Sequence, residues 1–109
     1  MNVATAWVLL FVAALLEPVF AVSMKYSQGF TRLVPSVVTV LLAVASIIIL
    51  SRSLRVIPVG TAYVVWTGLG AVGTVIAGIV LFDEPVTLGR IAAMGLVIVG
   101  VSALRFLGG

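Results

Sequence analysis

The residue with the clearest chemical potential in this sequence is Glu17, an acidic side chain inside a long apolar stretch. Residues 4–23 around it are almost all apolar, and about 20 such residues are enough to cross a bilayer as a helix. An ionised side chain at that depth costs about 3 kcal/mol or more, so a carboxylate there is expected to have a function. All six basic residues lie near the ends of apolar segments, so none can pair with Glu17 at its depth. The counter-charge is therefore expected to be a proton or a cationic ligand.

The residues on the same helix face as Glu17 indicate the environment of its carboxylate. Residues three and four positions away share its face of a helix, and they are Ala13, Ala14, Phe20 and Ala21. We expect Ala13, Ala14 and Phe20 to line a site that is small on one side and aromatic on the other. Pro18 removes the amide that would bond to the Ala14 carbonyl. The freed carbonyl either helps to line a cavity or belongs to a kink that a neighbouring helix satisfies.

Neutral hydrogen-bond donors elsewhere in the chain could hold the carboxylate without neutralising it. Tyr63 and Trp66 are three residues apart with Thr67 beside them, and Ser46 lies in an earlier apolar run. A phenol, an indole N–H and a hydroxyl are all suitable donors, and aromatic faces also suit a planar or quaternary cation. We therefore expect Tyr63, Trp66 and Ser46 to bind substrate and proton together with Glu17, and Thr67 to line the site. The alternative for Tyr63 is a place in the aromatic belt at the membrane surface.

The composition places these residues in a membrane protein. Of 109 residues, 63% are hydrophobic and 8% are charged, whereas soluble domains are usually about a quarter charged. The chain has no cysteine and no histidine, which excludes disulfides, thiolate chemistry and histidine-ligated metal sites. We expect no metal, no cofactor and no nucleic-acid partner. We also expect no enzymatic activity, because a lone carboxylate without a nucleophile–base pair or metal cluster is insufficient for catalysis.

The elements that must position Glu17 are four apolar runs separated by short polar breaks. We predict an all-α integral membrane protein with helices at about residues 4–24, 33–51, 58–82 and 87–106, in one domain spanning residues 1–109. The first run is expected to be retained as a span, because no basic segment precedes it as in a signal peptide. Each run is close to the length that the hydrocarbon core requires.

The basic residues give no preferred orientation across the membrane. With four spans, Arg52, Arg55 and Arg105 lie on one side and Lys25, Arg32 and Arg90 lie on the other. Three against three leaves the positive-inside rule undecided. Either small differences select one topology, or the chain inserts both ways and pairs as an antiparallel dimer. Ala93 and Gly100, small residues a heptad apart in the last run, allow close helix packing; they are expected either at such a dimer contact or against helices of the same chain.

Several stretches resemble the small multidrug resistance transporters. They are Glu17, the segment KYSQGFTRL at residues 25–33 followed by Pro35 and Ser36, and the segment PVGTAYVVWTGLG at residues 58–70. The similarity covers essentially the whole chain, including its length and its four spans. The TGLGAVG stretch at residues 67–73 and Ser46 look more like the guanidinium-exporting branch than the branch that exports polyaromatic drugs.

The resemblance implies an antiparallel homodimer of dual topology in the cell inner (plasma) membrane. It implies that Glu17 of both subunits binds substrate and protons in competition, and that Tyr63, Trp66 and Ser46 match positions lining the site. Gly68 and Gly70 match a flexible point of the third helix, and the fourth helix matches the dimer contact. The expected function is proton-coupled export of guanidinium or small substituted guanidinium ions.

Two residues depart from the guanidinium-exporting pattern. Members of that branch usually carry tryptophan where this chain has Phe20 and a small aliphatic residue where it has Pro18. A more apolar site could favour quaternary ammonium cations, and the chain could also be one half of a heteromeric pair. A membrane scaffold that transports nothing is the third alternative, and it leaves the unpaired glutamate unexplained.

Overall fold

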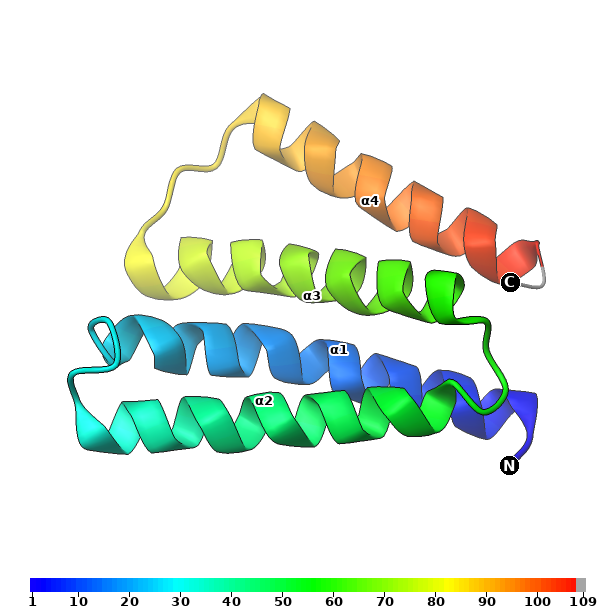
Figure 1. Cartoon of the computed structure of the whole chain (residues 1–109). Helices are drawn as coiled ribbons and strands as arrows, with labels where there is room; N and C mark the ends of the chain where they lie inside the picture. The colour runs from blue at the N-terminus through cyan, green and yellow to red at the C-terminus, as the bar shows by residue number, and fades with distance from the viewer. Residues whose placement is uncertain (108–109) are drawn as a thin grey trace.

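The four apolar runs form four α-helices within residues 1–107, the part of the chain that the computed structural model describes (Figure 1). The helices are α1 (Val3–Tyr26), α2 (Leu33–Ser53), α3 (Val59–Phe82) and α4 (Leu88–Phe106). All four are long and apolar enough to cross a membrane. This arrangement confirms the all-helical class and the four potential spans expected from the sequence.

Helix ends differ from the expected limits because polar residues take part in the terminal turns. Lys25 lies in the last turn of α1 and Arg52 in the last turn of α2, where a positive charge interacts favourably with the helix dipole. These two helices therefore extend two residues beyond the apolar runs. At the start of α4, the Thr87 hydroxyl accepts a hydrogen bond from the Arg90 amide at 3.1 Å, so Thr87 caps the helix.

Helix α1 lies between α2 and α3 and is the centre of the packing (Figure 1). Among the described residues, α4 packs mainly against α3, and the two helices diverge toward the loop that joins them (Figure 1). The Arg105 guanidinium of α4 also lies 4.7 Å from the centre of the Trp7 ring of α1. The buried core gathers around the first half of α1, where Trp7 and Leu10 pack with Val65 of α3. Helix α4 contributes only Val101 to it within residues 1–107.

The four helices form a flat arrangement, with principal extents of 41, 34 and 17 Å. Such a thin layer surrounds few side chains completely, and Glu17 remains half-buried. Most of α4 is exposed, as are large apolar side chains on every helix. Lipid or further protein is expected to cover these surfaces, because exposed apolar patches of this extent are unusual in water.

Candidate functional site

Glu17 lies well inside the membrane-spanning part of α1. It is fourteen residues after Val3, the first residue of the helix, which corresponds to about 21 Å along the helix axis. Within residues 1–107 one ion pair is formed, between Glu84 Oε1 and Arg90 Nη2 at 3.4 Å. No basic side chain in this part of the chain comes within 4.0 Å of the Glu17 carboxylate. The structure thus brings no fixed positive charge to this carboxylate within the described chain.

The side chain of Glu17 rests against the backbone of α3 at Gly70. A Cβ atom built on Gly70 would overlap the Glu17 carboxylate and would lie 2.8 Å from the Glu17 Cβ atom. Gly70 itself is buried. The absence of a side chain at this position therefore makes room for the carboxylate, a relation that the sequence reasoning did not identify.

The next residue of α1 makes a related contact one turn further along α3. A Cβ atom built on Gly73 would lie 3.0 Å from Cγ of Pro18, which is tighter than ordinary van der Waals contact. Helix α1 continues through Pro18 without ending. Gly70 and Gly73 are three residues apart and so share one face of α3. That face meets the Glu17–Pro18 pair, and the glycine spacing was the sequence signal that could have indicated it.

Ser46, Trp66 and Ala13 form a hydrogen-bonded chain that joins three helices. The Trp66 indole Nε1 donates to the Ser46 hydroxyl at 2.9 Å, and the Ser46 hydroxyl donates to the Ala13 carbonyl at 2.8 Å. Ser46 is completely buried. Both donors are therefore engaged with each other and with the backbone of α1, four residues before Glu17, rather than with its carboxylate. This chain fixes the Trp66 ring beside α1.

Tyr63 and Thr67 lie further from Glu17 along α3. Tyr63 is seven residues before Gly70, about 10 Å along the axis, and is 57% exposed. Its ring packs against Trp66 with 5.8 Å between centroids and 56° between planes. The Thr67 hydroxyl donates to the Tyr63 carbonyl of its own helix at 2.8 Å. The roles expected for both residues remain predictions.

The three residues of α1 expected to line the site differ in their surroundings. Ala13 and Ala14 are 0% and 2% exposed, so neighbouring side chains cover both of them, and the lining role expected for them remains a prediction. Phe20 is half-buried and lies one turn from Glu17 on the same face. Of the three, Phe20 is therefore the residue that keeps accessible surface close to Glu17.

Gly68 and Gly70, expected at a flexible point, contact different helices. A Cβ atom on Gly68 would lie 3.1 Å from Val97 and 3.2 Å from Val101, both on α4, whereas Gly70 meets Glu17 on α1. Two residues correspond to about 200° around a helix, which explains the opposite directions. Helix α3 is unbroken through both positions. The flexibility expected of them remains a prediction.

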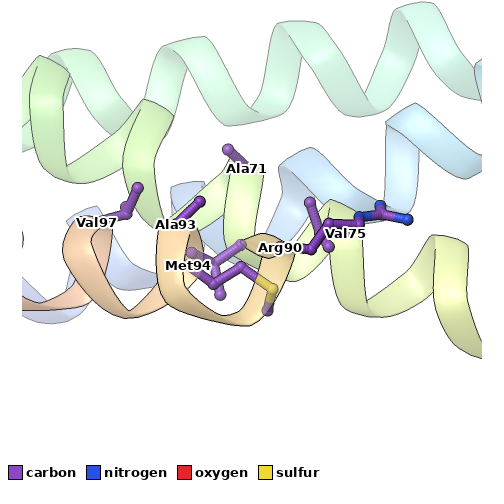
Figure 2. A pocket seen from close by; sticks show the side chains of 7 residues that line it. Ala71, Val75, Arg90, Ala93, Met94 and Val97 are labelled. Carbon is purple, nitrogen blue, oxygen red and sulfur yellow. The ribbon is translucent and has the colours of Figure 1, made fainter. Parts of the chain in front are cut away.

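Ala93 and Gly100, expected at a dimer contact, also have unlike surroundings. Ala93 lines a cavity of about 190 Å³ between α3 and α4, with Ala71 and Val75 opposite and Arg90 at one end (Figure 2). A Cβ atom on Gly100 would meet nothing within 4 Å. Ala93 thus faces α3 of the same chain, one of the two possibilities that the sequence left open, while Gly100 lies on a bare surface.

A carboxylate in this setting can bind a proton or a cation. Carboxylate oxygens accept hydrogen bonds from N–H donors, and charge-assisted bonds of this kind are about twice as strong as neutral ones. Phe20 lies one turn after Glu17 on α1, and Trp66 of α3 is bonded through Ser46 to the α1 backbone one turn before it; aromatic faces of this kind can contact an apolar or planar cation. Within residues 1–107, no group of three acidic side chains is arranged to hold a metal ion.

Comparison with known proteins identifies a family and several relatives. Residues 5–97 match the model of the family described as Small Multidrug Resistance protein. A protein of Yersinia pseudotuberculosis serotype I named "Guanidinium exporter" is 48% identical over 100 residues, covering 92% of this chain and 96% of the relative. Proteins of the same name from Citrobacter freundii and Salmonella typhimurium are 47% identical, covering 92% of this chain and 95% of each relative.

Proposed function

The chain belongs to the Small Multidrug Resistance protein family, and we propose that it exports guanidinium or small substituted guanidinium cations in exchange for protons. Relatives that match nearly its whole length are named for guanidinium export. The observation that carries the proposal is the half-buried Glu17 carboxylate, far inside a membrane-spanning helix and without a basic partner within residues 1–107. A group in this position is expected to bind whichever positive species enters.

Guanidinium fits this carboxylate by shape and by charge. The ion is planar and carries paired N–H donors, which form parallel hydrogen bonds to the two oxygens of a carboxylate. A protonated Glu17 has no charge and loses one acceptor site, so proton and cation exclude each other. Cation binding should therefore weaken as the pH falls. Export follows if a proton taken from one side of the membrane displaces the cation toward that side.

Residues near Glu17 would complete the binding site. We propose that Trp66, held by the hydrogen bond from its indole to Ser46, presents its ring to the bound cation, with Tyr63 beside it. Ser46 would act through Trp66 and through the Ala13 carbonyl. A ring whose position is fixed before binding loses little conformational freedom when the cation arrives.

Two copies of the chain in opposite orientations would form the transporter. A single chain is only 17 Å thick, so a second copy is the simplest way to enclose Glu17 with protein. The basic residues are divided equally between the two ends, with Arg52, Arg55 and Arg105 at one end and Lys25, Arg32 and Arg90 at the other. Equal division permits both insertions. We place the dimer in the cell inner (plasma) membrane, where a transmembrane proton gradient can drive export.

A second candidate substrate class is the hydrophobic quaternary ammonium cations. Phe20 is half-buried on the Glu17 face and offers an apolar ring without an N–H donor. A quaternary ammonium ion donates no hydrogen bond and is recognised by aromatic faces. This feature favours such ions over guanidinium at the Phe20 side of the site, whereas the two carboxylate oxygens favour guanidinium.

Proteoliposomes containing the purified chain test the function. A guanidinium gradient should move protons, reported by a pH-sensitive dye, and Glu17→Gln should reduce this movement to that of empty liposomes. Glu84→Gln is the matched control, because Glu84 lies in the loop after α3 and pairs with Arg90 in the first turn of α4, and it should retain transport. Proton movement that persists in Glu17→Gln would refute the proposal. A hydrophobic tetra-alkylammonium ion in place of guanidinium decides between the two substrate classes: proton movement with guanidinium alone supports the first class, and movement with the tetra-alkylammonium ion alone supports the second.

The proposed dual topology has its own test, made simple by the absence of cysteine from the chain. Val86 lies in the loop between α3 and α4 and is 60% exposed. A single Val86→Cys variant in intact cells should react only partly with an impermeant maleimide, and the remainder should react after the membrane is opened. Complete labelling from one side, or none, would contradict insertion in both orientations. Transport that appears only when a second, related chain is supplied would show a heteromeric pair instead.

A further inference from the structure

Gly70 of α3 lies directly against the Glu17 side chain of α1. A Cβ atom on Gly70 would overlap the carboxylate group and would come within 2.8 Å of the Glu17 Cβ atom. Real Cβ atoms essentially never show such contacts, so any side chain at residue 70 would displace Glu17. We propose that Gly70 is a positioning residue that holds the Glu17 carboxylate against α3 in the orientation that binds the cation.

Gly70 makes this contact, whereas Gly68, two residues before it on α3, does not. Gly68 faces Val97 and Val101 of α4, at 3.1 and 3.2 Å from a Cβ atom built on it, and does not contact Glu17. If both glycines served mainly to make α3 flexible, their replacements should have similar effects. A role in positioning instead predicts that the two replacements differ, because only residue 70 touches the carboxylate.

The backbone at Gly70 also has its own hydrogen-bond partner. The Thr74 hydroxyl donates to the Gly70 carbonyl at 2.7 Å, in addition to the amide of the helix itself. This carbonyl is therefore already engaged by the helix amide and by the Thr74 hydroxyl. Gly70 contributes space to the site rather than a ligand atom.

The orientation of the carboxylate matters because the cation binds through two oxygens. A guanidinium ion requires both oxygens in one plane with its paired N–H groups, and an error of about 1 Å in such a site can cost up to a hundredfold. A methyl group on residue 70 would push the carboxylate away from α3. This step rests on the proposed function, whereas the contact between Gly70 and Glu17 does not.

Few other charged groups lie close enough to Glu17 to change its competition between proton and cation. The elements packed most extensively against α1 are α2 and α3, and their titratable side chains are Arg52 in the last turn of α2 and Tyr63 near the start of α3. Two further charged groups approach α1: the Arg105 guanidinium of α4 lies over the Trp7 ring, and the Glu84 carboxylate lies at Gly78, two turns beyond Gly70. On α1 itself, Lys25 and Tyr26 lie at its end. None of these side chains is within one helical turn of Glu17 in the sequence or at the level of Gly70. A change in proton–cation competition caused by a methyl at residue 70 therefore reports on Glu17.

The first experiment measures guanidinium binding to the purified full-length chain across a range of pH. Gly70→Ala should lower guanidinium affinity about tenfold to a hundredfold and shift the pH at which protons displace half of the cation. Gly68→Ala is the comparison variant on the same helix, and in it the pH at which protons displace half of the cation should be unchanged. Gly60→Ala is the neutral control, because a Cβ atom there meets nothing within 4 Å.

Two results of this experiment would overturn the inference. One is a Gly70→Ala variant that binds guanidinium with unchanged affinity and pH midpoint while its transport slows, since this would make Gly70 a flexible point only. The other is an equal loss of affinity in Gly68→Ala and Gly70→Ala. Failure of the unmodified chain to bind guanidinium would instead count against the proposed function, and the second experiment then decides the inference.

The second experiment needs no substrate. Stability in detergent is compared for Gly70→Ala in the unmodified chain and in a Glu17→Ala background, which removes the carboxylate but keeps the Cβ atom. The destabilisation caused by Gly70→Ala should be clearly smaller in the Glu17→Ala background, because the overlapping oxygen atoms are gone. Equal destabilisation in both backgrounds would refute the contact, and this comparison also remains informative if Gly70→Ala alone folds too poorly for binding measurements.

Discussion

Replacing Ser46 with alanine should weaken the packing of α2 against both α1 and α3. Its hydroxyl accepts from Trp66 Nε1 at 2.9 Å and donates to the Ala13 carbonyl at 2.8 Å, and the side chain is 0% exposed. Alanine would break both hydrogen bonds at once. The indole N–H of Trp66 would then lose its partner in an apolar environment.

The size of the effect follows from these two bonds. Hydrogen bonds between helices in membrane proteins contribute about 0.6 kcal/mol on average and up to about 1.7 kcal/mol. Leaving a buried donor without a partner costs about 1–3 kcal/mol. We therefore expect Ser46→Ala to reduce the free energy of unfolding by about 2 kcal/mol, which changes the unfolding equilibrium more than tenfold.

Ser53→Ala is the matched control for this prediction. Ser53 also lies on α2 and is 0% exposed, but its hydroxyl donates to the Leu50 carbonyl of its own helix at 2.6 Å. A serine that bonds back to its own helix adds little stability, so its replacement should be nearly neutral. Unfolding by sodium dodecyl sulfate in mixed micelles, followed by circular dichroism, compares the two variants. A Trp7→Phe background lets the emission of Trp66 report its own environment, because these are the two tryptophans of the chain.

The reasoning would be refuted by equal stabilities of Ser46→Ala and Ser53→Ala. It would also be refuted by a Trp66 emission spectrum that is unchanged in Ser46→Ala, since the indole would then have no hydrogen bond to lose. Trp66→Phe combined with Ser46→Ala should cost less than the sum of the two single changes, because both remove the same bond.

Three further predictions concern the ends of the helices and are measured by the same unfolding assay. Thr87→Ala should cost about 1 kcal/mol by removing the cap from the Arg90 amide, and Thr87→Ser should restore it. Glu84→Gln should cost less than about 1 kcal/mol, because its pair with Arg90 is 3.4 Å long and more than 30% exposed on both sides; a large loss would show a stronger role for this pair. Phe82→Leu should cost about 1–2 kcal/mol, because Lys25 Nζ lies 4.4 Å from its ring centroid and the Tyr26 ring 5.5 Å from it, and a Lys25→Met background should remove only the share that comes from the cation.

The helices could be predicted from the sequence because their signals are local. The length of each apolar run sets a membrane span, and the breaks carry basic residues, prolines or an acidic turn. The ends were less certain, since Lys25 and Arg52 continue their helices past the apolar residues. A basic side chain reads as a break in the apolar pattern, yet it is favourable in the last turn of a helix.

The partners of the candidate site could be predicted only in part. Glu17 and Trp66 were proposed as site residues from their residue types and depth, and the structure brings Trp66 to α1 through Ser46. Ser46 was expected to donate to the carboxylate, but its hydroxyl bonds to the Ala13 carbonyl instead. Gly70 was expected only as a flexible point, although it contacts Glu17 directly. Residue type indicates what a side chain can bind, but it does not indicate which neighbour it will meet.

The sequence by itself determined that this protein crosses a membrane and places one carboxylate far from every fixed positive charge. Only the tertiary structure decided that Glu17 lies on Gly70, that Pro18 lies on Gly73 and that Ser46 joins α2 to the backbone of α1. The physical reason is that helices in lipid are apolar on nearly all sides, so periodicity does not reveal which face is buried. Their rotation and offset are set by close packing at small residues and by interhelical hydrogen bonds, which exist only once the helices have assembled.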